Sequence, residues 1–329
     1  MFKLLIAARS FGFASNRALE EFDIIQNLSI EKPPHDLAFT EEQMSMLVPD
    51  KDAIIVGTDK ITKKVIKIAK RLKFITKNGV GVDNIDIQAA TEAGILVTNM
   101  PGINDRAVAD MTLGLILSLS RGICQASSQI KYGTWDKILS HDVYEKTLGV
   151  IGTGRIGEEV IKRARGFDMK IIAYDADPII ENASKYDFQY VEFDELLKSS
   201  DIVSIHVPLN PVTNNLIAEP EFAKMKSSAF LINTSRAGIV NEIDMLKALK
   251  NKTIAGAAID VYPKEFPEYP EVYKLDNLII TPHIAAYTFE TLEKMDMVLV
   301  EAYRHIVRGE LPENLNILNS QVQLARYES

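Results

Sequence analysis

Three glycines in one short segment constrain the fold of this chain more than any other feature. Gly152, Gly154 and Gly157 have the G-x-G-x-x-G spacing, directly after an apolar run and directly before a helical pattern. Eighteen residues after Gly157, Asp175 ends a second apolar run, 171–174. This order of strand, glycine turn, helix, strand and acid predicts a dinucleotide-binding unit built on parallel strands.

Each residue of this motif has a physical role in binding a dinucleotide. Gly152 allows a tight turn out of the strand, and Gly154, which has no Cβ, allows the backbone to approach a pyrophosphate. Gly157 lets the following helix pack close to the sheet, and the pyrophosphate then lies at the positive end of that helix. Asp175 can accept hydrogen bonds from both hydroxyls of a ribose and would repel a 2′-phosphate. The motif therefore predicts NAD, and not NADP, as the cofactor.

Composition argues against several other classes of protein. The net charge is −8, from 37 basic and 45 acidic side chains, and no basic stripe stands out, so we expect no nucleic-acid partner. The single cysteine, Cys124, excludes an internal disulfide and fits a reducing compartment. The longest apolar stretch, 111–119, is far shorter than a membrane span. We therefore expect a cytoplasmic protein with no membrane partner, and we predict no metal site.

Strand-like and helical runs alternate along the chain, which predicts an α/β fold with parallel sheets. The expected strands are 3–8, 53–56, 74–76, 95–98, 202–207, 230–233, 256–259 and 278–281, and the expected helices are 62–71, 85–93, 104–128, 242–250 and 290–308. The helix over 104–128 has apolar residues on several faces, so we expect it to be buried at a domain or subunit interface.

The length of 329 residues predicts about two domains, both Rossmann-like. We assign the NAD-binding Rossmann domain to 102–286. The substrate-binding, flavodoxin-like domain is then discontinuous, with residues 1–101 and 287–329, and the site is expected in a cleft between the domains. The chain would cross between them near Pro101 and near Ala285.

Three segments of the second half follow expected strands and carry polar residues. They are 232–238, which contains Asn233, Thr234 and Arg236; 259–262, which contains Asp260 and is followed by Glu265; and 281–286, which contains His283. Ligands of open α/β sheets bind at the carboxyl ends of strands. We therefore expect these segments to contribute to one site.

These motifs, together with Asn78-Gly79-Val80-Gly81-Val82-Asp83-Asn84, resemble the D-isomer-specific 2-hydroxyacid dehydrogenase family, which includes D-3-phosphoglycerate dehydrogenase. The resemblance covers about residues 50–290, with five motifs in the same order. It implies an NAD-dependent oxidoreductase that acts on the CH–OH group of a small 2-hydroxy acid, with Arg236, Glu265 and His283 as catalytic residues.

The chemistry of these three side chains agrees with that implication. Arg236 has a planar fork that can hold the carboxylate of a 2-oxo acid and polarise the neighbouring oxygen. His283 can donate a proton to the carbonyl oxygen during reduction, or accept it during oxidation. A carboxylate such as Glu265 stabilises the imidazolium and orients the ring. His206, by contrast, is expected to be a packed residue near the cofactor.

The resemblance also implies further contacts. Gly152, Gly154, Arg155, Ile156 and Gly157 line the pyrophosphate, Asp175 binds the ribose, Val207 and Thr234 contact the cofactor, and Asp260 contacts the nicotinamide amide. Gly79, Val80 and Gly81 form an anion-binding turn that holds the substrate carboxylate opposite Arg236.

The sequence leaves the substrate open. Thr58 and Asp59 stand where an arginine for a substrate phosphate is expected, and Lys77 is the remaining basic candidate there. 3-Phosphoglycerate therefore competes with glyoxylate, hydroxypyruvate and branched 2-oxo acids. An NAD-sensing, corepressor-like binding protein is the alternative from another class. A homodimer or a larger homo-oligomer is expected.

Overall fold

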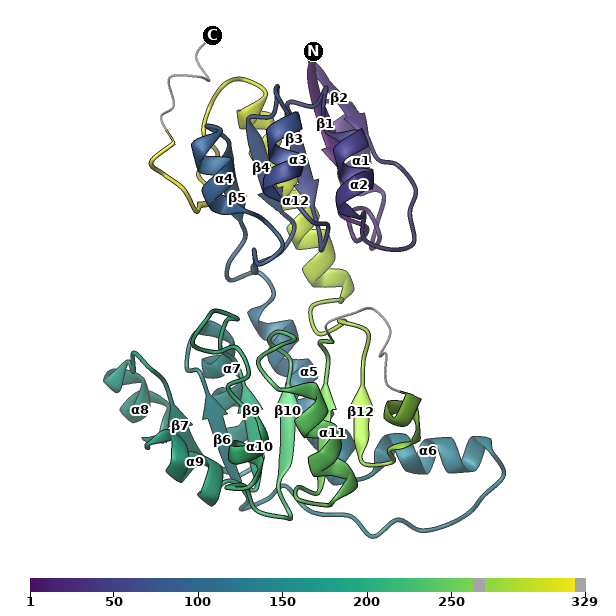
Figure 1. The fold of residues 1–329 in the computed structure, drawn as a ribbon, viewed down its shortest axis with the longest axis vertical. Coiled ribbons are helices and arrows are strands. Elements are labelled where there is room, and N and C mark those ends of the chain that lie inside the picture. The colour runs from purple at the N-terminus through teal and green to yellow at the C-terminus, as the bar shows by residue number, and fades with distance from the viewer. Residues whose placement is uncertain (263–269, 323–329) are drawn as a thin grey trace. The chain divides into compact units, whose positions relative to one another are not determined.

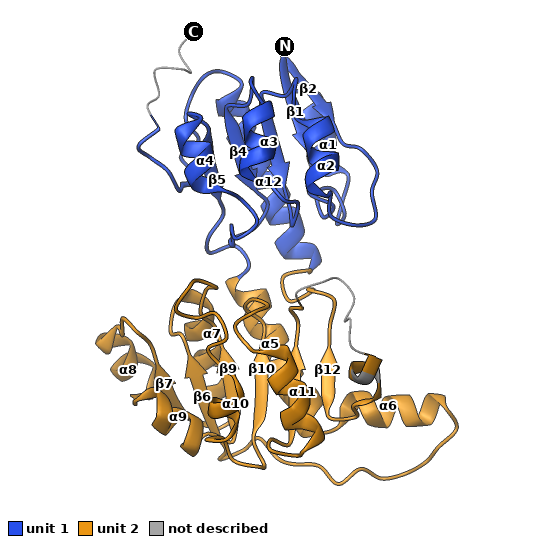
Figure 2. Ribbon diagram, in the orientation of Figure 1, with its two compact units in different colours: residues 1–104, 288–329 blue, residues 105–287 orange. Residues whose placement is uncertain are grey.

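The computed structural model describes residues 1–262 and 270–322. The described chain forms two compact units, each with one sheet and its own core (Figure 2). Unit 1 contains Met1–Asn104 and Thr288–Ser329, and unit 2 contains Asp105–Tyr287. Unit 1 is discontinuous because the whole of unit 2 is inserted into it.

Unit 1 has a mostly parallel sheet in the order β13-β5-β4-β3-β1-β2 (Figure 1). Its strands are β1 (Phe2–Ile6), β2 (Leu28–Glu31), β3 (Ala53–Val56), β4 (Phe74–Lys77), β5 (Leu96–Asn99) and the antiparallel β13 (Asn316–Ile317). Its helices are α1 (Arg17–Asp23), α2 (Glu41–Leu47), α3 (Lys63–Ile68), α4 (Ile87–Glu92) and α12 (Phe289–Ile306). Leu4 and Ile6 pack with α1 and α12, whereas Leu5 packs with α2, α3 and α4. Alternate strand residues therefore bury opposite faces of the sheet under helices.

Unit 2 has a parallel sheet in the order β12-β11-β10-β9-β6-β7-β8. Its strands are β6 (Thr147–Ile151), β7 (Lys170–Tyr174), β8 (Gln189–Tyr190), β9 (Ile202–Ile205), β10 (Phe230–Asn233), β11 (Gly256–Ile259) and β12 (Leu278–Ile280). Its helices are α5 (Asp105–Ser120), α6 (Ile123–Lys131), α7 (Arg155–Arg165), α8 (Ile180–Tyr186), α9 (Phe193–Ser199), α10 (Glu219–Phe222) and α11 (Glu242–Lys250), with a 3₁₀ turn, η1 (Pro270–Lys274). Val150 packs with α5 and α7, and Ile151 packs with α9 and α11 on the other face.

The expected fold class, α/β with two mostly parallel sheets, is confirmed. Two local predictions are wrong. The helix expected over 104–128 is two helices, α5 and α6, bent by 64° at a break where Gly122 has a φ of +62°. The strand expected over 202–207 ends at Ile205, so His206 lies just beyond the strand.

No single described helix is long and apolar enough to cross a membrane, although the bent pair α5 and α6 meets the same criterion by length and composition. Much of α5 is covered by unit 2 itself: Leu113, Leu115 and Ile116 are at most 6% exposed. In α6, by contrast, no residue is buried.

Candidate functional site

The glycine turn joins β6 to α7 and presents backbone donors. Gly152 has a φ of +93°, and its N–H donates to the carbonyl of Tyr174 at 2.8 Å. Helix α7 has Gly154 as its N-cap and no side-chain cap, so its first N–H groups have no acceptor from a capping side chain. A Cβ on Gly154 would meet no heavy atom within 4 Å, which means that the backbone is open to a ligand. The turn therefore fits a pyrophosphate.

Asp175 follows β7 and is oriented by the same turn. Its Oδ2 accepts the N–H of Thr153 at 2.7 Å and the Thr153 hydroxyl at 3.0 Å, and its Oδ1 accepts the N–H of Asp177 at 3.0 Å. The Thr153 hydroxyl also lies 2.8 Å from the hydroxyl of Tyr190 on β8. A carboxylate accepts about four hydrogen bonds, so Asp175 retains acceptor capacity for a ribose.

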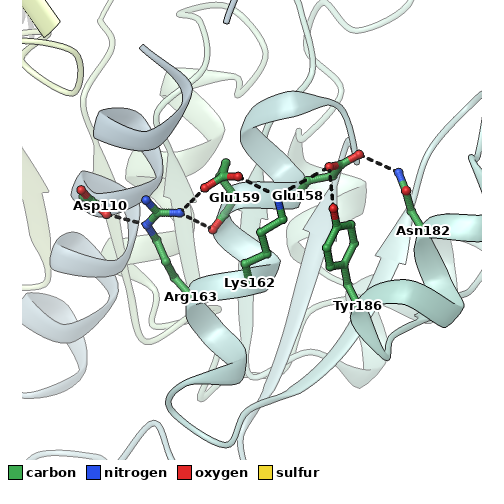
Figure 3. A network of polar contacts seen from close by, with 7 residues as sticks. All are labelled: Asp110, Glu158, Glu159, Lys162, Arg163, Asn182 and Tyr186. Atoms are coloured by element: carbon green, nitrogen blue, oxygen red, sulfur yellow. Dashed lines mark hydrogen bonds and ion pairs between the residues drawn. The ribbon is translucent and has the colours of Figure 1, made fainter. Parts of the chain in front are cut away.

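A network of charged and polar side chains fixes α7 to its neighbours (Figure 3). It joins Asp110 of α5, then Glu158, Glu159, Lys162 and Arg163 of α7, then Asn182 and Tyr186 of α8. Arg163 Nε donates to Asp110 Oδ1 at 2.5 Å, and Asn182 donates to Glu158 Oε1 at 2.6 Å. Hydrogen bonds from Lys162 and Arg163 lower the pKa of Glu159 below its ordinary value. The network holds in place the helix whose N-terminus faces the glycine turn.

Arg236 lies on the turn after β10, and the buried Asn233 braces that turn. Asn233 Oδ1 accepts the N–H of Ser235 at 3.0 Å, and its Nδ2 donates to the carbonyl of Arg236 at 3.0 Å. The Ser235 hydroxyl donates to the carbonyl of Ile205 at 2.5 Å, which ties the turn to β9. The half-buried Arg236 side chain donates to the carbonyl of Ser235 at 2.7 Å. The bracing role of Asn233 was not predicted, since it depends on side-chain geometry within the turn.

The other predicted cofactor positions also lie just beyond the carboxyl ends of strands in the unit 2 sheet. Val207 follows β9, and its Cγ1 is 2.8 Å from where a Cβ on Gly152 would lie. Thr234 is buried, and its hydroxyl is 3.0 Å from that of Thr112 on α5. Arg155 and Ile156 form the first turn of α7.

Asp260, which follows β11, fixes the segment that carries His283. Its carboxylate is 1% exposed and accepts the hydroxyl of Thr281 at 2.5 Å, the N–H of Ile284 at 2.9 Å and the N–H of Ala285 at 2.8 Å. These bonds bracket His283, which is exposed and has a left-handed φ of +56°. Asp260 therefore braces the His283 turn, in addition to the nicotinamide contact that the resemblance implies.

His206 is unsuited to proton transfer. Its Nε2 lies 2.7 Å from the hydroxyl of Ser204, and burial lowers the pKa of its imidazole to about 3. The ring is therefore neutral throughout the physiological pH range. This packing agrees with the expectation of a packed residue, at a position just after β9 and beside Val207.

The same burial predicts acid lability. An unfolded histidine titrates near about pH 6.5, so between that value and about pH 3 the unfolded state binds one more proton. The stability that depends on neutral His206 is therefore complete above about pH 6.5 and falls by up to about 1.4 kcal/mol per pH unit below it. His206→Asn should lack this loss. Denaturant unfolding from about pH 7 to about pH 5 should show the unmodified protein losing free energy relative to the variant, and a constant difference would contradict the prediction.

The predicted carboxylate-binding turn of unit 1 follows β4. Gly79 has a φ of +142°, and its carbonyl accepts the N–H of Met100 at 3.0 Å. Asn99 donates to the carbonyl of Val80 at 2.7 Å. These bonds fix the turn to the end of β5. Lys77 is 7% exposed and donates to the carbonyl of Gly57 and to Asn84 Oδ1, so it braces loops of unit 1.

Glu265 lies outside the described residues. Within residues 1–262 and 270–322, no group of three or more His, Cys, Asp or Glu side chains could hold a metal ion.

Known proteins resemble this chain in sequence and in fold. The sequence model described as "D-isomer specific 2-hydroxyacid dehydrogenase, NAD binding domain" matches residues 113–285. The chain is 42% identical over 281 residues to D-3-phosphoglycerate dehydrogenase of Methanocaldococcus jannaschii, covering 84% of this chain and 53% of that protein. It is 41% identical over 278 residues to glyoxylate reductase of Thermococcus litoralis, covering 82% and 84%. D-lactate dehydrogenase of Aquifex aeolicus, solved with NAD and lactic acid, superposes with a TM-score of 0.83 at 29% identity, covering 97% and 99%.

The fold and the glycine turn thus define a dinucleotide-binding protein. The chain belongs to the D-isomer-specific 2-hydroxyacid dehydrogenase family, and NAD is its cofactor. It spans about half the length of the phosphoglycerate dehydrogenase relative from Methanocaldococcus jannaschii. The family and the cofactor predicted from the sequence motifs are therefore confirmed.

Proposed function

We propose that this chain transfers a hydride between NAD and C2 of a small 2-hydroxy or 2-oxo acid. The proposal rests on one observation. Arg236 and His283 follow β10 and β12, so both lie at the carboxyl ends of strands in the parallel unit 2 sheet. Each lies on a turn held by a buried polar side chain, Asn233 for Arg236 and Asp260 for His283. Such bracing preorganises side chains for chemistry.

The proposed roles follow from the chemistry of each group. NADH supplies the hydride when bound. Arg236 binds the substrate carboxylate and polarises the adjacent carbonyl, which favours attack at C2. His283 donates a proton to the oxygen that becomes the hydroxyl, and Glu265 stabilises the protonated ring. The turn of Gly79, Val80 and Gly81 donates N–H groups to the same carboxylate.

The proposed activity is tested by following NADH absorbance with a panel of 2-oxo acids, scored by kcat/KM. The panel contains 3-phosphohydroxypyruvate, hydroxypyruvate, glyoxylate and a branched 2-oxo acid. Relatives named phosphoglycerate dehydrogenase, hydroxypyruvate reductase and glyoxylate reductase support the first three. Tight NADH binding with no turnover of any member would favour the corepressor-like alternative.

Asp175 is expected to determine the choice of cofactor. Asp175→Asn keeps an acceptor for the N–H and hydroxyl of Thr153 but removes one carboxylate acceptor and the charge that repels a 2′-phosphate. The ratio of kcat/KM for NADPH to that for NADH should rise about tenfold or more, because like charges in contact cost several kcal/mol. An unchanged ratio would contradict the assignment of Asp175 to the ribose.

We also propose that the protein is a homodimer in which a second copy covers α6 and the segment after it. Ile123 and Ile130 of α6 are each 51% exposed, and Tyr132, Trp135 and Leu139 are at least 84% exposed. Large exposed apolar patches are typical of protein interfaces. Light scattering should give twice the chain mass, and Trp135→Ser with Leu139→Ser should shift the protein toward monomer. A monomeric unmodified protein would overturn this proposal.

A further inference from the structure

The turn of Gly79, Val80 and Gly81 contains two backbone N–H groups that the fold itself leaves unbonded. The N–H of Gly79 donates to the carbonyl of Lys77 at 3.0 Å. Within residues 1–262 and 270–322, by contrast, no hydrogen bond takes up the N–H of Val80 or that of Gly81. Consecutive backbone N–H groups in a turn can bind an anion, so the proposed carboxylate contact falls on these two donors.

The direction of each N–H follows from the carbonyl group in the same peptide unit. A trans peptide unit is planar, and its C=O and N–H point in opposite directions; no peptide bond in the described ranges is cis. The carbonyl of Gly79 accepts the N–H of Met100 at 3.0 Å, so the N–H of Val80 points away from Met100. The carbonyl of Val80 accepts Nδ2 of Asn99 at 2.7 Å, so the N–H of Gly81 points away from Asn99. Two consecutive residues at the end of β5 thus set the directions of both donors.

The amide of Asn99 is held in one orientation by a second asparagine. Asn99 is 6% exposed, and the Val80 carbonyl that it faces can only accept, so the Asn99 atom on that side must be the NH₂ group. Its Oδ1 then faces β13, where it accepts Nδ2 of Asn316 at 2.9 Å. Asn99 and Asn316 lie directly opposite each other in the antiparallel pair of β5 and β13. Turning the Asn99 amide round would place two oxygen atoms against each other.

The segment that carries Asn316 is itself fixed against β5. The N–H of Leu318 donates to the carbonyl of Val97 at 2.9 Å. The fully buried Asn319 accepts the N–H of Val97 at 2.8 Å and donates to the carbonyl of Ile95 at 2.9 Å. These bonds set the register of β13, so Asn316 reaches Asn99 from a defined position.

The contacts on the other side of the turn hold a different part of it. The N–H of Asn78 donates to the carbonyl of Val56 at 2.8 Å, and its Nδ2 donates to the Ser10 hydroxyl at 3.1 Å. Both bonds fix the chain before the turn, and neither involves the two carbonyl groups that set the N–H directions. Those carbonyls depend on Met100, which acts through its backbone, and on Asn99, which acts through its side chain.

We propose that Asn99 is a positioning residue that directs the backbone donors of the turn toward the substrate carboxylate, and that Asn316 of the C-terminal strand β13 holds the Asn99 amide in the required orientation. The assignment rests on the proposed function, since it takes the carboxylate of a 2-oxo acid to bind this turn. An exposed side chain near the end of the chain thereby controls substrate affinity without contacting the substrate.

Asn99→Leu tests the first part, because leucine has a similar size but cannot donate to Val80. The KM for the best 2-oxo acid of the panel should rise by about tenfold to hundredfold, since hydrogen bonds to a charged group are lost or weakened. The kcat and the Kd for NADH should change little, because the carboxylate is held equally in the ground state and the transition state. Calorimetry with oxamate, an unreactive 2-oxo acid analogue, added to the NADH complex should show the same loss of affinity.

Asn316→Ala tests the second part at an exposed position. The KM should rise by about twofold to tenfold, the range for one neutral hydrogen bond. In the Asn99→Leu background the same change should add nothing, because Asn316 acts through Asn99. Asn314→Ala is the matched control: Asn314 is also exposed, lies two residues earlier and donates to the carbonyl of Val298 at 2.9 Å. It should leave the KM unchanged.

Denaturant unfolding shows whether each variant is folded, and Asn316→Ala decides alone if Asn99→Leu does not fold. An unchanged KM and oxamate affinity, in a protein that reduces 2-oxo acids, would overturn the assignment and leave the proposed function in place. So would a loss of kcat and NADH affinity in proportion to stability, which a merely structural role predicts. Weaker oxamate binding in the variants of a protein that reduces no 2-oxo acid would overturn the proposed function and retain the role of Asn99.

Discussion

Replacing His283 with alanine should lower kcat by about 10²–10⁴-fold, the range for a positioned acid–base group, with little change in NADH affinity. The two effects separate because His283 follows β12, an edge strand of the unit 2 sheet, whereas the glycine turn and Asp175 follow β6 and β7, several strands away in the sheet order. Asp260 holds the turn through Thr281 and backbone N–H groups, not through the imidazole. The turn should therefore persist without the ring.

Because the backbone at His283 is left-handed, alanine there would also introduce strain, and a second variant is needed to separate strain from loss of the imidazole. A φ of +56° is unfavourable for alanine but is tolerated by asparagine, so His283→Asn removes the proton carrier with less strain. Both variants should lose kcat alike, and only alanine should lose stability. His305→Asn is the control, because that ring lies 2.8 Å from Glu310 on the surface of unit 1. Substantial turnover in both His283 variants would remove His283 from the proposed site.

Continuous apolar runs located the central strands accurately. β3, β10 and β11 have the expected bounds, because strands buried on both faces read as uninterrupted apolar segments. The edge strands β2 and β13 were not predicted, since they are short and at most half-buried. The helix break at Gly122 was missed because apolar residues continue on both sides of it, and the sequence shows no sign of the left-handed φ.

Sequence motifs predicted the residues of the candidate site, but they did not predict the hydrogen bonds that hold those residues in place. Asp175 and Arg236 were located by their order after apolar runs, which local patterns reveal. The three hydrogen bonds of Asp260 and the contact between Ser10 and Asn78 join segments distant in the sequence. Their partners depend on strand order and loop geometry, so only the folded chain reveals them.

Gly157→Ala should both destabilise the protein and abolish tight NADH binding. A Cβ there would lie 2.0 Å from the carbonyl oxygen of Gly152, within the backbone of the glycine turn itself. No rotamer relieves a clash between a Cβ and a backbone oxygen, so α7 must move away from β6. Overpacking of this kind costs about 1–3 kcal/mol or more. The free energy of unfolding and the Kd for NADH should therefore change together.

Gly154→Ala is the matched comparison. Its φ of −65° suits alanine, and its Cβ would meet nothing within 4 Å, so the fold should keep its stability. The added methyl group would instead occupy the approach of the pyrophosphate, and NADH affinity alone should fall. Comparing the change in the free energy of unfolding with the change in NADH affinity distinguishes a glycine required for folding from one required for binding the nucleotide. Equal loss of stability in both variants, measured by denaturant unfolding without nucleotide, would show that the turn is not built as described.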